Sequence, residues 1–184
     1  KKQIWREASY EDFADGQFGN GGQNLFCSRK GMLQRIFHFD INADGYTDLL
    51  FVNAQDMNER VDLDLYEDPF GKQQVRHLPT AGAFAGAIGD LNGNGYDDLV
   101  IANQHNGVHG DICSYVYFGS EDGLSEARRL ELHAPNARAA AIGDFFGNKR
   151  PAIALATENR LRLYPQNEQG LDATRHIDLD LAVT

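Results

Sequence analysis

Residues 90–99 read Asp-Leu-Asn-Gly-Asn-Gly-Tyr-Asp-Asp-Leu, and residues 40–49 repeat the pattern as Asp-Ile-Asn-Ala-Asp-Gly-Tyr-Thr-Asp-Leu. A third and more divergent copy occupies residues 144–153, where it reads Asp-Phe-Phe-Gly-Asn-Lys-Arg-Pro-Ala-Ile. The leading aspartates of the three copies stand 50 and 54 residues apart. A recurring unit of about 40 to 50 residues is typical of the blades of a β-propeller. The sequence therefore predicts a repeat protein.

The stretches beside each copy have the patterns of short β-strands. Residues 49–53 and 99–103 are apolar up to a final asparagine, and residues 161–164 alternate as Leu-Arg-Leu-Tyr. Alternation with a period of two is typical of a half-buried strand, and no window of the chain carries a convincing helical stripe. We therefore predict an all-β fold, a β-propeller segment of about three to four four-stranded blades.

The repeat divides the chain into four units. Residues 1–31 are predicted to be a partial blade or a terminal strand segment, residues 32–79 and 83–133 to be blades with an acidic loop, and residues 137–184 to be a degenerate blade. Closed propellers contain about 4 to 8 blades. We therefore expect that further blades, or another chain, are needed to close the ring.

The charge of the chain limits its partners. Its 184 residues include 17 Lys and Arg against 27 Asp and Glu, a formal net charge of −10, which argues against nucleic acid as a partner. Uninterrupted apolar runs reach only four or five residues, whereas a membrane-spanning helix needs about 20, so we expect no membrane insertion. Cys27 and Cys113 lack the spacing of a zinc motif and are predicted to be buried free thiols.

The two intact acidic loops carry oxygen-bearing side chains at positions 1, 3, 5 and 9, counted from the leading aspartate. Glycine at position 6 permits a sharp turn, and the backbone carbonyl at position 7 adds another oxygen. Ca²⁺ takes about six to eight oxygen ligands, whereas Mg²⁺ requires a tighter octahedron. We predict two structural calcium sites. Their ligands are Asp40, Asn42, Asp44, Tyr46 and Asp48 in the first loop, and Asp90, Asn92, Asn94, Tyr96 and Asp98 in the second.

The acidic loops have two other interpretations. Asp, Asn and Gly are common turn formers, so the loops could be turns without any ion. An EF-hand needs a glutamate at position 12, but Phe51 and Ile101 stand there, inside apolar stretches. In the third copy Phe146 and Arg150 replace ligands, so we predict no metal there. Lys149 or Arg150 is a candidate for the positive charge that an ion would bring.

These residues resemble the FG-GAP (VCBS) repeats, the calcium-binding blades of integrin-α-type β-propellers. Such repeats also occur in bacterial secreted proteins, some lectins and some polysaccharide lyases. The resemblance covers about residues 32–180, with a degenerate third copy. It implies that the ten residues above bind Ca²⁺, and that the protein is extracellular, periplasmic or at the cell surface. It implies no particular activity, because unrelated functions share one fold.

Two further groups of residues are candidate ligand sites. The polar loop at 103–111 contains His105, His109 and Asp111, which could bind a transition metal or a ligand, although a solvated turn is the simpler interpretation. The second group consists of aromatic residues near the start of the sequence, which could stack on sugars or pack within a strand: Trp5, Tyr10, Phe13 and Phe18.

Two classes of function are compatible with the sequence. The favoured one is a non-catalytic, calcium-stabilised binding or scaffold module of an exported or cell-surface protein, with a glycan or protein ligand on its loop face. This class includes carbohydrate binding and cell adhesion. The alternative is part of a propeller-based polysaccharide-degrading enzyme of the lyase type, for which the sequence identifies no catalytic residues.

Overall fold

The computed structural model describes residues 25–27, 32–55, 58–67 and 74–181 of the 184-residue chain. The described residues form antiparallel β-strands, and their helical element is a short 3-10 turn, η1 (Glu126–Arg128). The prediction of an all-β fold is therefore confirmed.

Three large sheets follow one another along the chain, and we call them the first, second and third blades. The first contains β1 (Leu25–Cys27), β2 (Leu33–Phe39), β3 (Asp48–Gln55), β4 (Leu63–Glu67) and β5 (Gln74–Leu78). The second contains β6 (Ala83–Gly89), β7 (Asp98–Asn103), β8 (Cys113–Tyr117) and β9 (Arg129–His133). The third contains β10 (Ala139–Gly143), β11 (Ala152–Ala156), β12 (Arg160–Tyr164) and β15 (Ile177–Asp180).

A small hairpin interrupts the third blade between its last two strands. It consists of β13 (Gln166–Asn167) and β14 (Gly170–Leu171), which pair with each other. This hairpin was not predicted from the sequence.

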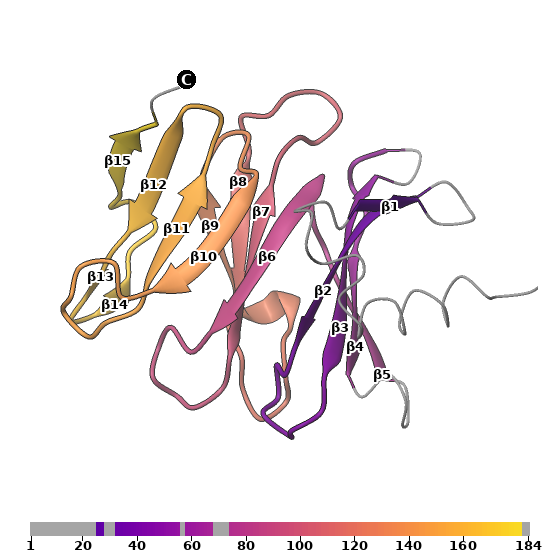
Figure 1. Cartoon of the computed structure of the whole chain (residues 1–184), viewed down its shortest axis with the longest axis horizontal. Helices are drawn as coiled ribbons and strands as arrows, with labels where there is room; N and C mark the ends of the chain where they lie inside the picture. The colour runs from indigo at the N-terminus through magenta and orange to yellow at the C-terminus, as the bar shows by residue number, and fades with distance from the viewer. Residues whose placement is uncertain (1–24, 28–31, 56–57, 68–73, 182–184) are drawn as a thin grey trace, which may run out of the picture.

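The blades lie side by side in chain order, as in a segment of a propeller. Figure 1 shows the first blade at the right, the second in the middle and the third at the left. Within each blade the strands are hydrogen-bonded in sequence order, and β6 lies alongside both β3 of the first blade and β10 of the third. The described residues do not close a ring.

Two hydrophobic cores lie between successive blades. The first includes Leu50 and Val52 of the first blade together with Leu99 and Ile101 of the second, all fully buried. The second core includes Val100 and Ala102 of β7 together with Ile153 and Leu155 of β11. All six residues of β7 are buried, because this strand contributes side chains to both cores. This double burial explains its continuous apolar sequence.

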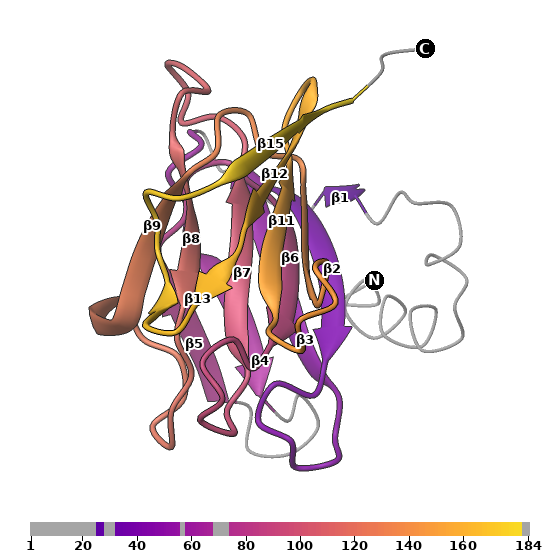
Figure 2. The same cartoon turned by 90° about the vertical axis from the view of Figure 1, so that its left-hand side faces the viewer.

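The acidic loops and the polar loop lie at opposite ends of the molecule. The connections β2–β3 and β6–β7 are at the lower end in Figures 1 and 2, and the β7–β8 connection, which contains the polar loop, is at the upper end. No helix among the described residues is long and apolar enough to cross a membrane.

The predictions for the cysteines and the early aromatic residues are tested only in part. Cys113 is a free thiol, as predicted, but it is half-buried rather than buried, at the first position of β8. Cys27 belongs to β1, and its side chain is outside the described set. The aromatic group between Trp5 and Phe18 also lies outside the described residues.

Candidate metal centre

The aspartate at position 1 organises each intact acidic loop by accepting hydrogen bonds from the backbone. Asp90 Oδ1 accepts from the N–H groups of Gly93, at 2.8 Å, and Asn94, at 3.2 Å, and its Oδ2 accepts from Gly95 N–H at 2.9 Å. Asp40 makes the matching bonds in the first loop, with two donors at 3.0 Å each. The two loops are thus folded around their leading carboxylates in the same way.

Position 6 has a left-handed backbone in all three copies. The φ angle is +87° at Gly45, +85° at Gly95 and +61° at Lys149. Glycine adopts this conformation without strain, whereas a residue with a Cβ atom does not. The divergent third copy therefore keeps the turn and bears its strain at a lysine.

Positions 3 and 5 also turn their side-chain oxygens toward the loop backbone. Asn92 Oδ1 accepts from Asn94 N–H at 3.0 Å, and Asn94 Oδ1 accepts from Tyr96 N–H at 2.8 Å. In the first loop Asn42 and Asp44 accept the matching bonds at 3.1 and 2.8 Å. Each such oxygen has two lone pairs, so one remains for a cation.

The aspartate at position 9 has a role that the sequence analysis missed. Asp48 is 1% exposed and Asp98 is 0% exposed. The Oδ2 atom of each accepts the N–H of position 2, Ile41 or Leu91, at 2.9 Å. Asp98 Oδ1 also accepts the N–H of Gly119, just after β8, at 2.7 Å. This residue therefore clamps the loop onto the blade as well as offering oxygens to an ion.

The electrostatic environment of Asp98 shows competing effects. Burial raises the pKa of its carboxyl group, the N–H groups of Gly119 and Leu91 lower it, and the nearby charges of Asp90 and Asp97 raise it again. The amide of Asn94 donates to the carbonyl of Gly119 at 3.1 Å, which fixes the same junction a second time. The second loop is thus bonded to the end of the third strand of its blade.

The third copy shows what the loop becomes without the buried carboxylate. Ala152, 1% exposed, stands at position 9, and the N–H of Phe145 at position 2 donates to the carbonyl of Gly143 instead. Asp144 still accepts from Asn148 and Lys149, at 3.0 and 2.8 Å. These backbone donors, Lys149 N–H first, lower the pKa of Asp144. The third copy therefore forms the same turn although it lacks several of the predicted calcium ligands.

The first two loops face one another across the boundary between two blades. Burial raises the pKa of Asp97, and the charges of Asp90 and of Asp40, from the neighbouring blade, raise it further. A pocket of about 320 Å³ lies between these loops. Arg76 lines it, pairs with Glu67 at 3.3 Å through two nitrogens, and donates to the carbonyl of Leu124 at 3.3 Å. Carboxylates of two blades therefore repel one another at this end.

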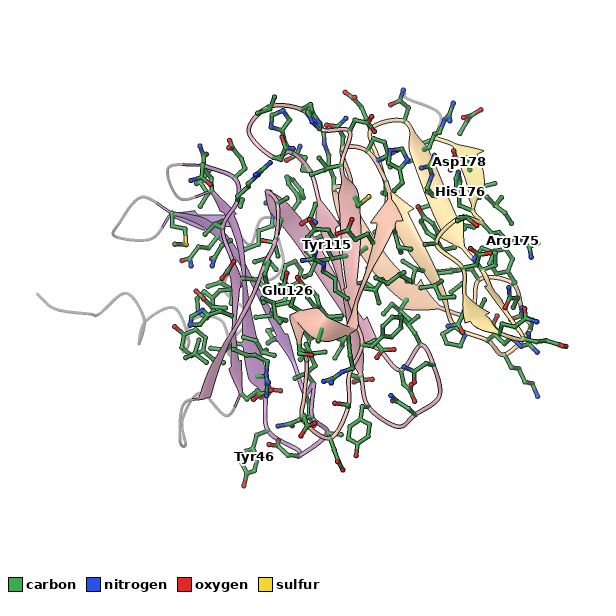
Figure 3. The ribbon with its side chains drawn as sticks, turned by 180° about the vertical axis from the view of Figure 1, so that it is seen from behind. Tyr46, Tyr115, Glu126, Arg175, His176 and Asp178 are labelled. Atoms are coloured by element: carbon green, nitrogen blue, oxygen red, sulfur yellow. The ribbon has the colours of Figure 1, made fainter. Side chains whose placement is uncertain are left out.

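The donor set fits calcium, although acidic side chains alone do not form a cluster. Within the described residues no three His, Cys, Asp or Glu side chains gather as metal ligands. Each loop instead offers a mixed set of carboxylate, amide and backbone oxygens, the hard ligands that Ca²⁺ accepts. Figure 3 shows Tyr46 at the tip of the first loop with its ring pointing away from the ribbon, consistent with a contribution from its backbone only.

The polar loop does not unite its three predicted residues. Asp111 Oδ1 lies 2.7 Å from Nε2 of His133, a residue that the sequence analysis did not single out. His105 accepts the N–H of Gly107 on Nδ1 at 3.0 Å. The polar loop contacts the connections before and after the second blade. Gly82, before β6, lies against the carbonyl of His105, and the N–H of Asn136, after β9, donates to the carbonyl of Gly110 at 2.8 Å.

Comparison with known proteins supports the repeat assignment. Residues 82–118, from the start of β6 to just beyond β8, match the FG-GAP repeat family. The chain carries an FG-GAP repeat. It is also similar to integrin alpha-IIb of Mus musculus, with 32% identity over an alignment 115 residues long; the match covers 52% of this chain and 11% of the integrin. The recognition of an integrin-like repeat from sequence is therefore confirmed, and the fold is that of a propeller module.

Proposed function

We propose that this FG-GAP segment is a calcium-stabilised binding module of an exported or cell-surface protein. The observation that carries the proposal is the equivalence of the two intact loops: both present oxygens at positions 1, 3, 5 and 9 and share one backbone hydrogen-bond pattern. A turn alone does not require oxygen-bearing side chains at all four positions, because the third copy forms the same turn without all of them.

The ion would be structural. The ligands would be the five predicted residues of each loop, with Tyr46 and Tyr96 contributing backbone carbonyls. A divalent cation would offset the repulsion among Asp40, Asp90 and Asp97 that raises the pKa of Asp97. Because the loops connect strands and meet a neighbouring blade, binding free energy would add to folding free energy.

Calcium removal tests this proposal. We expect excess chelator to lower the melting temperature of the calcium-loaded protein, and magnesium to restore less of it than calcium does. Asp90→Ala should remove calcium binding by the second loop and leave the first loop's site intact. Asp144→Ala is a matched control, because it alters an equivalent turn that lacks the ligand set. A melting curve insensitive to chelator would refute the proposal.

The ligand surface would lie at the opposite end, on the polar loop. Val108 at its tip is 82% exposed, and the loop is held by the connections before and after the second blade. A loop positioned by a rigid scaffold is a common site of recognition. The likeness to an integrin favours a protein ligand, and a glycan is the other candidate.

A panel of purified glycans and extracellular-matrix proteins tests the ligand surface. The double variant His105→Ala/His109→Ala should weaken binding at least about tenfold, the loss of roughly 1.4 kcal/mol of binding free energy. Phe146→Ala, at the other end of the molecule, should leave affinity unchanged. Equal ligand affinities of the parent protein, the double variant and the Phe146→Ala variant would exclude the polar loop as the ligand site.

A further inference from the structure

The polar loop contains an asparagine followed by glycine, and hydrogen bonds hold the reactive groups of both residues. The pair is Asn106 and Gly107, in the β7–β8 connection at the upper end of the molecule in Figures 1 and 2. The backbone nitrogen of a glycine can attack the side-chain amide of the preceding asparagine, because glycine has no side chain to shield it. The product is a cyclic succinimide, which water opens to aspartate or isoaspartate.

The attacking nitrogen is hydrogen-bonded to an imidazole ring. Gly107 N–H donates to Nδ1 of His105 at 3.0 Å. A ring nitrogen that accepts this bond carries no proton, so it can take the proton of the amide as a general base. The distance lies within the reach of about 2.6–3.2 Å that proton transfer requires. His105 is therefore placed to activate the nitrogen of Gly107.

The side-chain carbonyl under attack accepts two hydrogen bonds from the backbone. Oδ1 of Asn106 accepts the N–H of Val108 at 3.0 Å and the N–H of His109 at 3.1 Å. Negative charge develops on this oxygen when a nitrogen adds to the amide carbon, and fixed N–H donors stabilise such charge. The two backbone groups therefore form an oxyanion hole within the loop.

Position 107 requires glycine for two independent reasons. Its φ is +91°, and a Cβ atom there would lie 2.4 Å from Oε2 of Glu59. A larger residue would be strained, so the structure keeps the nitrogen free of a neighbouring side chain. Gly107 is exposed and Val108 is 82% exposed. Water can therefore reach a succinimide formed at this position.

The two Asn-Gly pairs of the second acidic loop are held differently. Gly93 N–H and Gly95 N–H each donate to a carboxylate oxygen of Asp90, at 2.8 and 2.9 Å. The negative charge of that carboxylate disfavours loss of a proton from either nitrogen. The amide nitrogen of Asn94, which would be the leaving group, donates to the carbonyl of Gly119 at 3.1 Å. The same dipeptide therefore meets a carboxylate in the acidic loop and a neutral base in the polar loop.

We infer that the polar loop modifies itself, the nitrogen of Gly107 attacking Cγ of Asn106 with His105 as the general base. A bond forms between that nitrogen and Cγ, and the amide proton passes to Nδ1 of His105. His105 returns the proton to the amide nitrogen of Asn106, the bond from Cγ to that nitrogen breaks, and ammonia leaves. Water then opens the succinimide at either carbonyl and leaves aspartate or isoaspartate at position 106.

The reaction gives the polar loop two chemical forms. It adds a negative charge, between His105 and His109, to the formal net charge of −10. An aspartate at position 106 keeps both bonds from the backbone and strengthens them, because a carboxylate accepts more strongly than an amide. Isoaspartate also lengthens the backbone. The inference depends neither on calcium nor on the proposed ligand surface, because every group it uses belongs to the loop itself.

Peptide mapping of the aged protein tests the inference. The folded chain is incubated at neutral pH in calcium buffer made with heavy-oxygen water, and mass spectrometry follows each Asn-Gly pair. Enzymatic methylation measures isoaspartate. Asn106 should convert at least about tenfold faster in the folded chain than in a synthetic peptide of residues 103–111. Asn92 and Asn94 should convert more slowly in the folded chain than in a peptide of residues 90–99.

Matched variants separate the general base from a structural histidine. His105→Ala should lower the rate at Asn106 at least about tenfold. His133→Ala removes an imidazole that contacts Asp111 at the end of the same loop, and it should leave the rate unchanged. Free imidazole should restore much of the rate in His105→Ala and change the parent little. Glu59→Gln should not slow the reaction, because a carboxylate beside Gly107 opposes loss of its amide proton.

Three results would overturn the inference. One is a rate at Asn106 that is no faster in the folded chain than in the peptide. Another is an equal rate in the parent and in His105→Ala. The third is a loss in His105→Ala that imidazole does not restore, because the histidine would then only shape the loop. The comparison of the folded chain with the peptide needs no variant, so it decides the question even if His105→Ala perturbs the loop.

Discussion

Replacing Asp98 by alanine tests whether the carboxylate at position 9 holds the second loop closed. The side chain is fully buried and accepts hydrogen bonds from Leu91 N–H, at 2.9 Å, and Gly119 N–H, at 2.7 Å. Alanine would leave both donors without this acceptor. Each loss costs about 1–3 kcal/mol, and the cost of burying the carboxylate offsets part of the sum, so we expect a loss of about 3 kcal/mol.

Urea unfolding in excess chelator measures this loss without any contribution from an ion. With a slope of about 1–3 kcal/mol per molar urea, the midpoint should fall by roughly 1–3 M. Asp97→Ala is the matched control, since this half-buried neighbour accepts no hydrogen bond among the described residues and is repelled by Asp90 and Asp40. Its midpoint should stay the same or rise slightly. A change below about 0.5 kcal/mol for Asp98→Ala, or an equal loss in both variants, would refute the clamp.

Three further predictions concern single side chains. Lys149→Gly should stabilise the protein by about 0.5–1 kcal/mol and Gly95→Ala should destabilise it by about 1–2 kcal/mol in thermal unfolding, because both positions have positive φ; opposite signs would contradict this. The Arg162 guanidinium lowers the pKa of Asp178 to about 2 from 3.8, so this pair stabilises the fold above about pH 4 and is lost as pH falls toward 2. Arg162→Met should therefore flatten the acid side of the stability profile, by about 1–2 kcal/mol at most; a profile as steep as the parent's would rule out that role for the pair. The hydroxyl of Tyr164 donates to the carbonyl of His133 in the second blade at 2.6 Å. Tyr164→Phe should therefore cost about 1 kcal/mol in urea unfolding, and no loss would mean that this hydroxyl bond contributes nothing.

The repeat made most of the blade architecture predictable. The apolar stretch at residues 99–103 lies in β7 (Asp98–Asn103), and the stretch at residues 49–53 lies in β3 (Asp48–Gln55). These segments are constrained at both ends, by the acidic loop and by polar connections. Burial makes these strands apolar stretches that are visible directly in the sequence.

The features that were missed depend on contacts distant in the chain. The hairpin β13–β14 has two-residue strands, which are too short to show a period. Asp111 pairs with His133, 22 residues away, and no local spacing signals that pair. Asp98 was considered only as a ligand, because its bond to Gly119 joins positions 21 residues apart.

Diffraction from crystals grown with calcium is the decisive test of calcium binding by the acidic loops. We expect one ion in each intact loop, within about 2.3–2.6 Å of the oxygens at positions 1, 3, 5, 7 and 9, and no ion beside Asp144. Empty first and second loops at saturating calcium would show that these loops do not bind calcium.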